Sequence, residues 1–289
     1  METTGTTTNT RTLQSELFLE MNEGQESSET HNIRIVRSTF KFKCQPNKPC
    51  PEKLSVDEDG DLVVRRSPLA KGIIIEHINR TLLNMVGMQV WRSALLMGDF
   101  ILENRDIFTN DQIILELGSG VGLSGIVAAM YCKEVIFTDI NNKDILSMIE
   151  KNINLNQDLV VSHTTVLPLN FNEPELPDAL YDKLKNLQIL IAADVIYDND
   201  ITKQFVNTLK KIMTTSPRKT AYIAMEKRYV FSSVDLEVCA PCYEYFNDLL
   251  SQNNNWCEVQ QLDCNFPQYF QYKKTKELVI FKLTANNSM

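Results

Sequence analysis

The sequence has little of what would hold a metal ion or a disulfide framework. Its 289 residues include three histidines, and its seven cysteines are spread along the chain. An odd number of scattered cysteines is typical of reduced thiols rather than of disulfides. Cys239 and Cys242 have metal-ligand spacing but lack a second close pair, and the histidines have no spacing suited to catalysis. The sequence therefore predicts no metal site.

Long hydrophobic runs and an excess of positive charge are also absent. No run of 18 apolar residues occurs, and the first residues lack the basic and then apolar layout of a secretory signal. A formal net charge of −8 opposes attraction to nucleic-acid phosphates. Because 43% of the residues are hydrophobic, the chain can bury a sizeable core. We expect an intracellular protein that binds neither membranes nor nucleic acid directly.

The composition divides the chain into three regions. Residues 1–32 are rich in Thr, Ser, Glu and Asn, apart from a short apolar patch at 17–21, and are expected to form a disordered tail. Residues 33–80 contain short alternating runs at 33–42, 61–66 and 73–78, which predict a β-rich extension. Residues 81–285 are expected to form the main domain.

The main domain alternates strand-like with helix-like segments. Strands are expected at 113–117, 135–139, 159–167, 187–197 and 220–227, and helices at 123–132, 143–156, 200–213 and 241–252. Such alternation is typical of a parallel sheet that is covered by helices on both faces. The last two runs, 256–263 and 277–284, have no helix between them, so we expect them to close the sheet as an antiparallel pair.

Glycine is scarce, yet four of the ten glycines fall within eight residues of the segment LELGSGVGLSG: Gly118, Gly120, Gly122 and Gly125. The segment follows one expected strand and opens a helix, at the sheet edge where ligands of doubly wound folds bind. Glycines there allow a tight turn and let a ligand approach backbone N–H groups at the helix start. A tight turn without a ligand is the alternative.

Two acidic residues narrow the ligand class. Asp139 ends the next expected strand, where an acidic side chain accepts hydrogen bonds from ribose hydroxyls; capping of the following helix is the alternative. The glycine spacing is G-x-G-x-G, with Leu123 where a dinucleotide fingerprint has its third glycine. Glu116 would repel a pyrophosphate and attract an amino group or a sulfonium. These features favour S-adenosylmethionine over NAD and leave an NAD-dependent oxidoreductase as an alternative.

Four segments resemble the seven-β-strand, class I methyltransferases that use S-adenosylmethionine, and within them the family 16 protein lysine methyltransferases. They are VWRSALLMGDFI at 90–101, the glycine segment, VIFTDIN at 135–141 and AADVIYD at 192–198. The resemblance covers about residues 82–283. It implies an α/β fold with a Rossmann-like seven-stranded sheet, mostly parallel with a C-terminal antiparallel strand.

The resemblance also implies which residues bind the cofactor. Trp91 would pack beside it, although a core or lid aromatic is the alternative for this residue. Glu116 would lie near the amino group, and Asp139 would bind the ribose hydroxyls. The remaining contacts would come from Gly118, Ser119, Gly120, Gly122 and Ala193.

The sequence departs from the family after the third strand of the domain. The family commonly has Asp-Trp beside the adenine, whereas this chain has Asn170 and Phe171. A phenylalanine can still stack on adenine and an asparagine can hydrogen-bond its edge, so both residues remain candidates for cofactor binding. A loop phenylalanine anchored in the core is the alternative.

The resemblance places the substrate edge of the site after the fourth strand. Asp194 and Tyr197 match the acid-x-x-aromatic motif of the family and would orient the reacting amine as the catalytic pair, with helix capping as the alternative for Asp194. Glu226 and Arg228 follow the fifth strand at the same sheet edge and would shape the substrate channel. A solvated salt bridge is the alternative for them.

These features predict an enzyme that transfers a methyl group to a lysine side chain of a protein substrate. One alternative is a cofactor-binding scaffold without turnover. Another is a methyltransferase that acts on nucleic acid or on a small molecule. Family analogy implies a nuclear or cytoplasmic location, and we expect a monomer.

Overall fold

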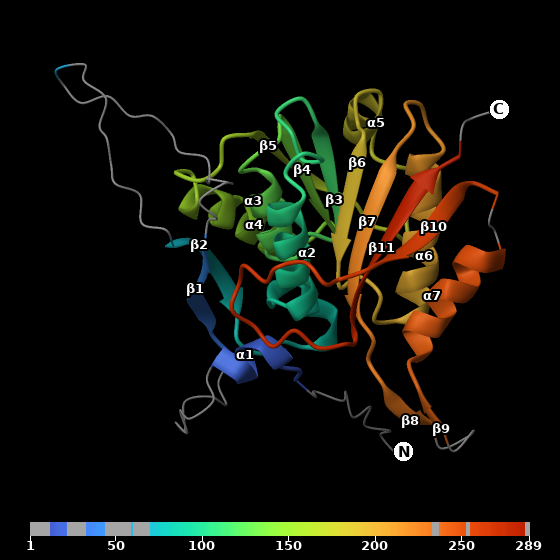
Figure 1. Ribbon diagram of the computed structural model, residues 1–289, viewed down its shortest axis with the longest axis horizontal. Helices are drawn as coiled ribbons and strands as arrows, with labels where there is room; N and C mark the ends of the chain where they lie inside the picture. Colours follow the sequence, from blue (N-terminus) through green and yellow to red (C-terminus); the bar gives the residue numbers. More distant parts are fainter. Residues whose placement is uncertain are drawn as a thin grey trace, which may run out of the picture.

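A seven-stranded sheet forms the centre of the molecule (Figure 1). The computed structural model describes residues 12–21, 33–43, 59, 70–232, 237–252 and 255–286. The strand order is β10-β11-β7-β6-β3-β4-β5. Their bounds are β3 Ile113–Leu117, β4 Glu134–Asp139, β5 His163–Pro168, β6 Ile189–Ala193, β7 Thr220–Glu226, β10 Cys257–Leu262 and β11 Leu278–Ala285.

The direction of the strands creates a ligand-binding crevice. β3 pairs in parallel with β4 on one side and with β6 on the other, so the chain winds outward in both directions from β3. Ligands of such sheets bind beyond the carboxyl ends of the strands at this switch point. β11 runs antiparallel to both β7 and β10. The expected antiparallel closure and the expected seven-stranded α/β fold are therefore confirmed.

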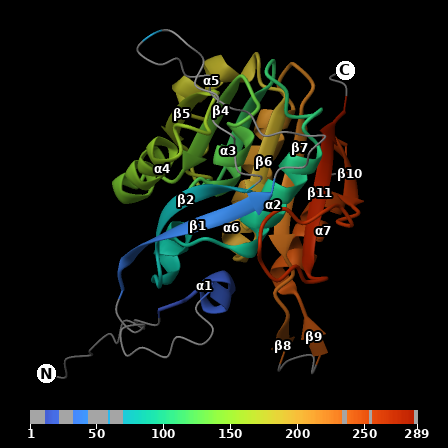
Figure 2. The ribbon, with the colours of Figure 1, turned by 60° about the vertical axis from the view of Figure 1, so that its left-hand side comes forward.

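Helices cover both faces of the sheet (Figures 1 and 2). One layer holds α2 Arg92–Glu103, α3 Leu123–Ala128 and α4 Lys143–Leu155; the other holds α5 Asp178–Leu184, α6 Asn199–Met213 and α7 Pro241–Gln252. Neighbouring strand residues bury their side chains in opposite layers, as Ile114 and Leu115 do. This two-sided burial explains why the central strands are continuously apolar in sequence.

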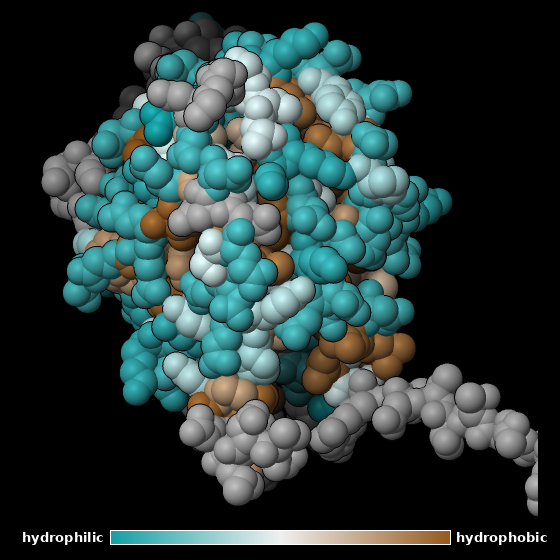
Figure 3. Space-filling model, turned by 90° about the vertical axis from the view of Figure 1, so that its right-hand side faces the viewer, coloured by the Kyte–Doolittle hydropathy of each residue, from teal (hydrophilic) through white to brown (hydrophobic). Residues whose placement is uncertain are grey.

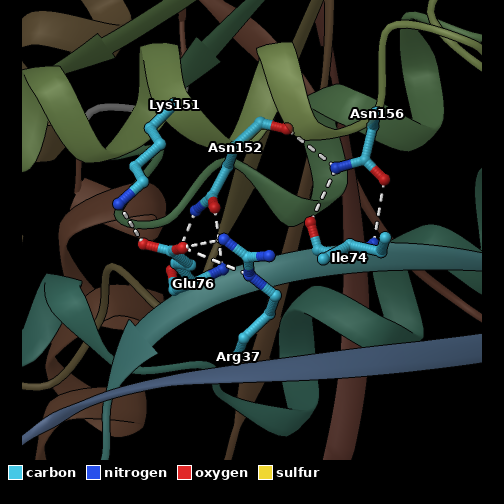
Figure 4. A network of polar contacts seen from close by, with 6 residues as sticks. All are labelled: Arg37, Ile74, Glu76, Lys151, Asn152 and Asn156. Atoms are coloured by element: carbon cyan, nitrogen blue, oxygen red, sulfur yellow. Dashed lines mark hydrogen bonds and ion pairs between the residues drawn. The ribbon is translucent and has the colours of Figure 1, made fainter.

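Strands β1 Ile35–Lys43 and β2 Ala70–Ile78 form a separate antiparallel sheet beside α4. Asn156 brackets Ile74, accepting from its backbone N–H at 2.8 Å and donating to its carbonyl at 2.7 Å. Asn152 does the same to Glu76, at 2.7 Å and 2.9 Å (Figure 4). Four residues of a helix and two of a strand both span roughly 6 Å, so the spacings match. The two side-chain amides thus make hydrogen bonds to the β2 backbone like those that a neighbouring strand would make.

The N-terminal segment corrects the prediction of a disordered tail at 1–32. Residues 16–21 form helix α1 (Glu16–Met21), which lies below β1 in Figure 2. Leu17 is only 2% exposed, and the backbone of Leu13 exchanges two hydrogen bonds with that of Thr81, at 2.7 Å and 2.9 Å. The prediction was wrong for residues 12–21 because the apolar patch at 17–21 is long enough to bury against the domain.

Several other elements differ from expectation. The strand expected at 187–197 ends at Ala193, because Asp194 takes a left-handed backbone conformation with φ of 61°. The sequence pattern did not predict the 3-10 helix η2 Leu83–Met88, the helix α5, or the small hairpin β8 Val230–Ser232 and β9 Glu237–Cys239. The strand expected at 61–66 lies outside the described residues. Among the described helices, none combines the length and apolarity that crossing a membrane requires.

Candidate cofactor and substrate site

A pocket of about 390 Å³ opens beyond the carboxyl ends of β3, β4 and β6. Most of the predicted site residues line it: Trp91, Glu116, Gly118, Ser119, Gly120, Asp139, Asn170, Phe171, Ala193, Asp194, Tyr197 and Arg228. Two predicted residues, Gly122 and Glu226, do not line it. The structure thus gathers six separate parts of the sequence at one end of the sheet.

The glycine loop is packed closely against the chain itself. Gly118, Gly120 and Gly122 have φ values of 66°, 55° and 82°, which residues with side chains rarely adopt. A Cβ atom on Gly120 would lie 2.6 Å from the carbonyl oxygen of Gly87, at the end of η2. Side chains are therefore excluded at Gly120 by the neighbouring backbone as well as by the turn.

Asp139 points back at the glycine loop. Its carboxylate accepts from the backbone N–H of Gly120 at 2.7 Å and from that of Ile140 at 2.8 Å. The cap of α4 is instead Asn142, which accepts from the Asp144 N–H at 2.9 Å. Burial raises the pKa of Asp139 above its ordinary value. The helix-capping alternative is wrong, and the remaining lone pairs of the carboxylate can accept hydrogen bonds from hydroxyl groups.

Glu116 is a buried carboxylate with half of its hydrogen-bonding capacity unused. Glu116 belongs to strand β3, beneath the glycine loop, and the residue is 2% exposed. Oε1 accepts from the Gly125 N–H at 3.0 Å, whereas Oε2 is buried without a hydrogen-bond partner among the described residues. Burial raises the pKa of Glu116 to about 8; the nearby Ser119 hydroxyl and the Gly125 N–H oppose this rise, and the charge of Asp139 adds to it. A cationic group in the pocket would supply the missing partner.

Asp194 and Arg228 form a bidentate ion pair over an aromatic ring. Arg228 donates from its two terminal nitrogens to the two Asp194 oxygens, at 2.8 Å and 2.9 Å. The guanidinium carbon lies 5.1 Å from the centroid of the Trp91 ring, whose Nε1 donates to the carbonyl of Val86 at 3.0 Å. α6 is capped by Asp198, so capping is not the role of Asp194. The Asp194 side chain is 3% exposed and that of Arg228 is 32% exposed, so the ion pair is half-buried.

Tyr197 lines this edge of the pocket, whereas Glu226 does not. Burial, with the nearby charges of Asp139, Asp198 and Asp194, raises the pKa of Tyr197 to about 12, so its hydroxyl stays protonated at neutral pH. Glu226 lies 3.4 Å from Arg92 in an ion pair. A neutral phenol can both donate and accept, which suits a group that orients an amine.

Phe171 both lines the pocket and packs into the core. Its ring meets that of the buried Phe205 edge-on, with centroids 5.4 Å apart. The side chain of Asn170 accepts from the Asn172 N–H at 3.1 Å, within its own turn. The core-anchoring alternative for Phe171 is therefore supported, while adenine contact by the two residues stays a prediction.

Sequence reasoning missed one wall of the pocket. Leu13, Gln14 and Glu16 line it from the N-terminal segment. Gln89 joins this segment to the domain: it accepts from the Ser15 N–H at 2.7 Å and donates to the Leu13 carbonyl at 3.2 Å. The apolar patch at 17–21 was the available signal, because an apolar run within a polar tail predicts a segment that docks.

Comparison with known proteins agrees with this geometry. A profile described as lysine methyltransferase matches residues 73–238. The chain belongs to the lysine methyltransferase family. S-adenosylmethionine is thus the cofactor expected from the family as well as from the residues, and the orphan oxygen of Glu116 together with the glycine loop and Asp139 fits it.

The chain is similar to several curated members of the family. It is 33% identical over 267 residues to methyltransferase-like protein 22 of Mus musculus, covering 83% of this chain and 66% of that one. The human protein of that name is 32% identical, with 83% and 64% coverage, so the chain spans about two thirds of the length of these relatives. Protein-lysine N-methyltransferase EEF2KMT of Mus musculus is 29% identical over 215 residues, covering 70% and 59%. Among solved structures, a SAM-dependent methyltransferase from Aquifex aeolicus aligns with a TM-score of 0.43 at 15% identity, covering 67% of this chain and 91% of that one.

Proposed function

We propose that the chain transfers a methyl group from S-adenosylmethionine to a lysine side chain of a protein. The observation that carries the proposal is the buried carboxylate of Glu116, whose Oε2 has no partner among the described residues and which lines the pocket beneath the glycine loop. A buried carboxylate without a partner is costly unless a cation compensates it. The ammonium group of S-adenosylmethionine is such a cation.

Different residues of the chain would bind different parts of the cofactor. Glu116 and the backbone of Gly118 and Gly120 would hold the methionine end, and Asp139 would accept from the ribose hydroxyls. Phe171 offers a ring face or edge to the adenine. When bound, S-adenosylmethionine supplies an electrophilic methyl group on a sulfonium.

The protein's main contribution to such a displacement is positioning. The site has to hold the lysine nitrogen in line with the methyl group and exclude water, and no covalent enzyme intermediate is needed. The lysine must lose a proton, since its ordinary pKa is about 10.4. Tyr197 can orient the neutral amine through its hydroxyl. Asp194 would act indirectly, by positioning Arg228, because both Asp194 oxygens accept hydrogen bonds from that guanidinium.

The surface near the pocket supports a protein as the substrate. The hairpin β8–β9 begins two residues after Arg228 and exposes Val230, Phe231 and Val238 at 50%, 64% and 66%. Figure 3 shows a mostly hydrophilic face whose apolar side chains gather toward its lower end. Clustered apolar side chains beside a pocket are typical of a protein-binding surface. The net charge of −8 also favours a basic protein over a nucleic acid.

A labelling experiment tests the proposal. Cell extract is incubated with the protein and labelled S-adenosylmethionine, and then divided between protease and nuclease. We expect label that protease releases and nuclease does not, and that Asp139→Ala abolishes. Nuclease-sensitive label would indicate a nucleic-acid substrate, and cofactor binding without any transfer would indicate a scaffold.

The proposal also includes where the protein is found in the cell and its oligomeric state. We infer a monomer in the nucleus or the cytoplasm, in keeping with the family resemblance. Light scattering of the purified chain and imaging of a tagged chain test these two statements.

A further inference from the structure

We propose that Glu16 forms a subsite for the positively charged amino group of the incoming substrate, with Glu226 adding negative charge from outside the pocket. The inference rests on the proposed function and assigns the group that captures the lysine before its proton is lost. Glu16 belongs to α1, which lies outside the residues matched by the family profile, 73–238. A segment outside the common domain would thus complete the site.

The segment that carries Glu16 is fixed at the pocket. The Leu13 backbone pairs with that of Thr81 through two hydrogen bonds. The side chain of Gln89 accepts from the Ser15 N–H at 2.7 Å, and Leu17 is 2% exposed. α1 is therefore held on both sides of Ser15, which aims Glu16 at the pocket that it lines.

Both carboxylates have unused and buried oxygens. Oε2 of Glu16 and Oε2 of Glu226 are each shielded from solvent and have no hydrogen-bond partner among the described residues. The Glu226 side chain as a whole is 10% exposed. Burial raises the pKa of Glu226; the positive charges of Arg92 and Arg228 oppose this rise, and the negative charges of Asp194 and Glu16 add to it, so these groups lie within electrostatic reach of Glu226.

The charges around the subsite do not balance. Arg228 donates to both oxygens of Asp194 and also attracts Glu16 and Glu226 electrostatically, while Arg92 is shared between Glu20 at 3.6 Å and Glu226 at 3.4 Å. The surrounding network contains four carboxylates but two guanidinium groups: Glu16, Glu20, Asp194 and Glu226 against Arg92 and Arg228. With all six groups ionised, the network therefore carries two more negative than positive charges.

A primary ammonium has the chemistry that this arrangement lacks. It brings one positive charge and three N–H donors, one of which can bind the free oxygen of Glu16. A phosphate would be repelled, and a neutral side chain would leave the carboxylates uncompensated. Asp194 cannot serve as well, because Arg228 already engages both of its oxygens. The subsite therefore selects a lysine side chain, or another primary ammonium, over neutral groups.

The test uses n-butylammonium, which has the length and charge of a lysine side chain, and its neutral counterpart 1-butanol. Saturation-transfer NMR measures the binding of each probe to the full chain in the presence of S-adenosylhomocysteine. We compare wild type with Glu16→Gln and Glu16→Asp. Glu20→Gln is the matched control, because it removes the same charge from the same helix at a residue that does not line the pocket.

We expect Glu16→Gln to weaken n-butylammonium binding about tenfold or more, since a charge-assisted hydrogen bond is lost. Glu16→Asp should restore part of the affinity, while Glu20→Gln and all 1-butanol signals should stay close to wild type. Equal n-butylammonium binding by wild type and Glu16→Gln would overturn the proposal, as would equal losses in Glu16→Gln and Glu20→Gln.

Two further measurements distinguish a failure of this proposal from misfolding of the variant and from a failure of the proposed function. Calorimetry with S-adenosylhomocysteine should give unchanged affinity in Glu16→Gln, which shows that the variant is folded. If Glu16→Gln loses that affinity, the Glu16→Asp variant is the test of the subsite. Its aspartate keeps the carboxylate, so failure to bind n-butylammonium would contradict the subsite. Glu16-dependent binding of n-butylammonium by a protein that transfers no methyl group would support the subsite and contradict the proposed function.

Discussion

The two oxygens of Asp194 are bound by the two terminal nitrogens of Arg228, at 2.8 Å and 2.9 Å, while the same guanidinium lies over Trp91. This relationship changes the role expected of Asp194. A carboxylate whose oxygens are both engaged is poorly placed to bind a lysine directly. It can instead fix an arginine that closes one side of the pocket, so Asp194 is better described as a positioning residue.

The ion pair can be tested with Arg228→Lys. Lysine cannot bind both oxygens in a planar fork, so we expect the turnover rate to fall about tenfold or more. Affinity for S-adenosylhomocysteine should change little, because Arg228 has no proposed cofactor contact. Rates and calorimetry measure the two effects. Lys227→Ala removes the neighbouring charge, which faces the Tyr243 ring, and should leave both quantities unchanged; a matching loss in that control would contradict the assignment.

Cofactor binding should release a proton from Glu116. Its pKa of about 8 leaves the carboxyl mostly protonated at pH 7, and a bound ammonium group favours the ionised form. Calorimetry of S-adenosylhomocysteine at about pH 7, in two buffers that differ in ionisation enthalpy, measures the release. We expect up to about one proton for wild type and close to none for Glu116→Gln. Equal values for both proteins would show that another group titrates.

The same carboxyl should make the free protein less stable as the pH rises. Its pKa is 4.5 ordinarily and about 8 in the folded chain, so the folded chain holds the extra proton between these values. The free energy of unfolding therefore falls as the pH rises through this window. Urea unfolding at about pH 5.5 and pH 7.5 should show a smaller decrease for Glu116→Gln than for wild type. Parallel decreases would be inconsistent with the raised pKa.

The close approach of Gly120 and Gly87 predicts an asymmetric response to alanine. Gly120→Ala puts a Cβ atom at a φ of 55° and 2.6 Å from the Gly87 carbonyl oxygen. The conformation alone costs roughly 1–2 kcal/mol, and the clash must displace the loop or η2. Gly87→Ala meets nothing nearer than 3.6 Å. Thermal unfolding should show a loss for Gly120→Ala only, and equal melting temperatures would argue against the packing.

The asparagines that hold β2 should contribute to stability. Asn152→Ala removes two hydrogen bonds to the Glu76 backbone and leaves buried polar groups unpaired, which costs about 2 kcal/mol. Asn154→Ala, on the exposed side of the same helix, is the control and should stay within roughly 0.5 kcal/mol of wild type. Denaturant unfolding measures both. An unchanged free energy of unfolding for Asn152→Ala would mean that β2 is held in some other way.

Local patterns predicted the sheet and much of the cofactor wall. The strand at 113–117 was predicted with the observed bounds, because a buried apolar run that ends at a glycine turn is a local signal. Asp139 was predicted for the same reason, since the end of the next strand has to lie beside the loop in a parallel sheet. Its capping alternative failed because Asn142 directly precedes α4 and takes that position.

Contacts between distant segments could not be predicted in this way. Ser15 and Gln89 are 74 residues apart and meet only once the domain has folded. The contact of Gly87 with Gly120 likewise depends on how η2 folds over the loop. The pairing of Asp194 with Arg228 depends on β6 and β7 ending side by side, which the sequence suggested, and on a left-handed Asp194, which it did not.

The most direct test of the account is mass spectrometry of protein methylated with S-adenosylmethionine that carries a deuterated methyl group. We expect deuterated methyl groups on lysine side-chain nitrogens of one or a few proteins in extract treated with wild type, and none with Asp139→Ala. Deuterated label on other residues or on nucleic acid, or equal label with Asp139→Ala, would contradict it.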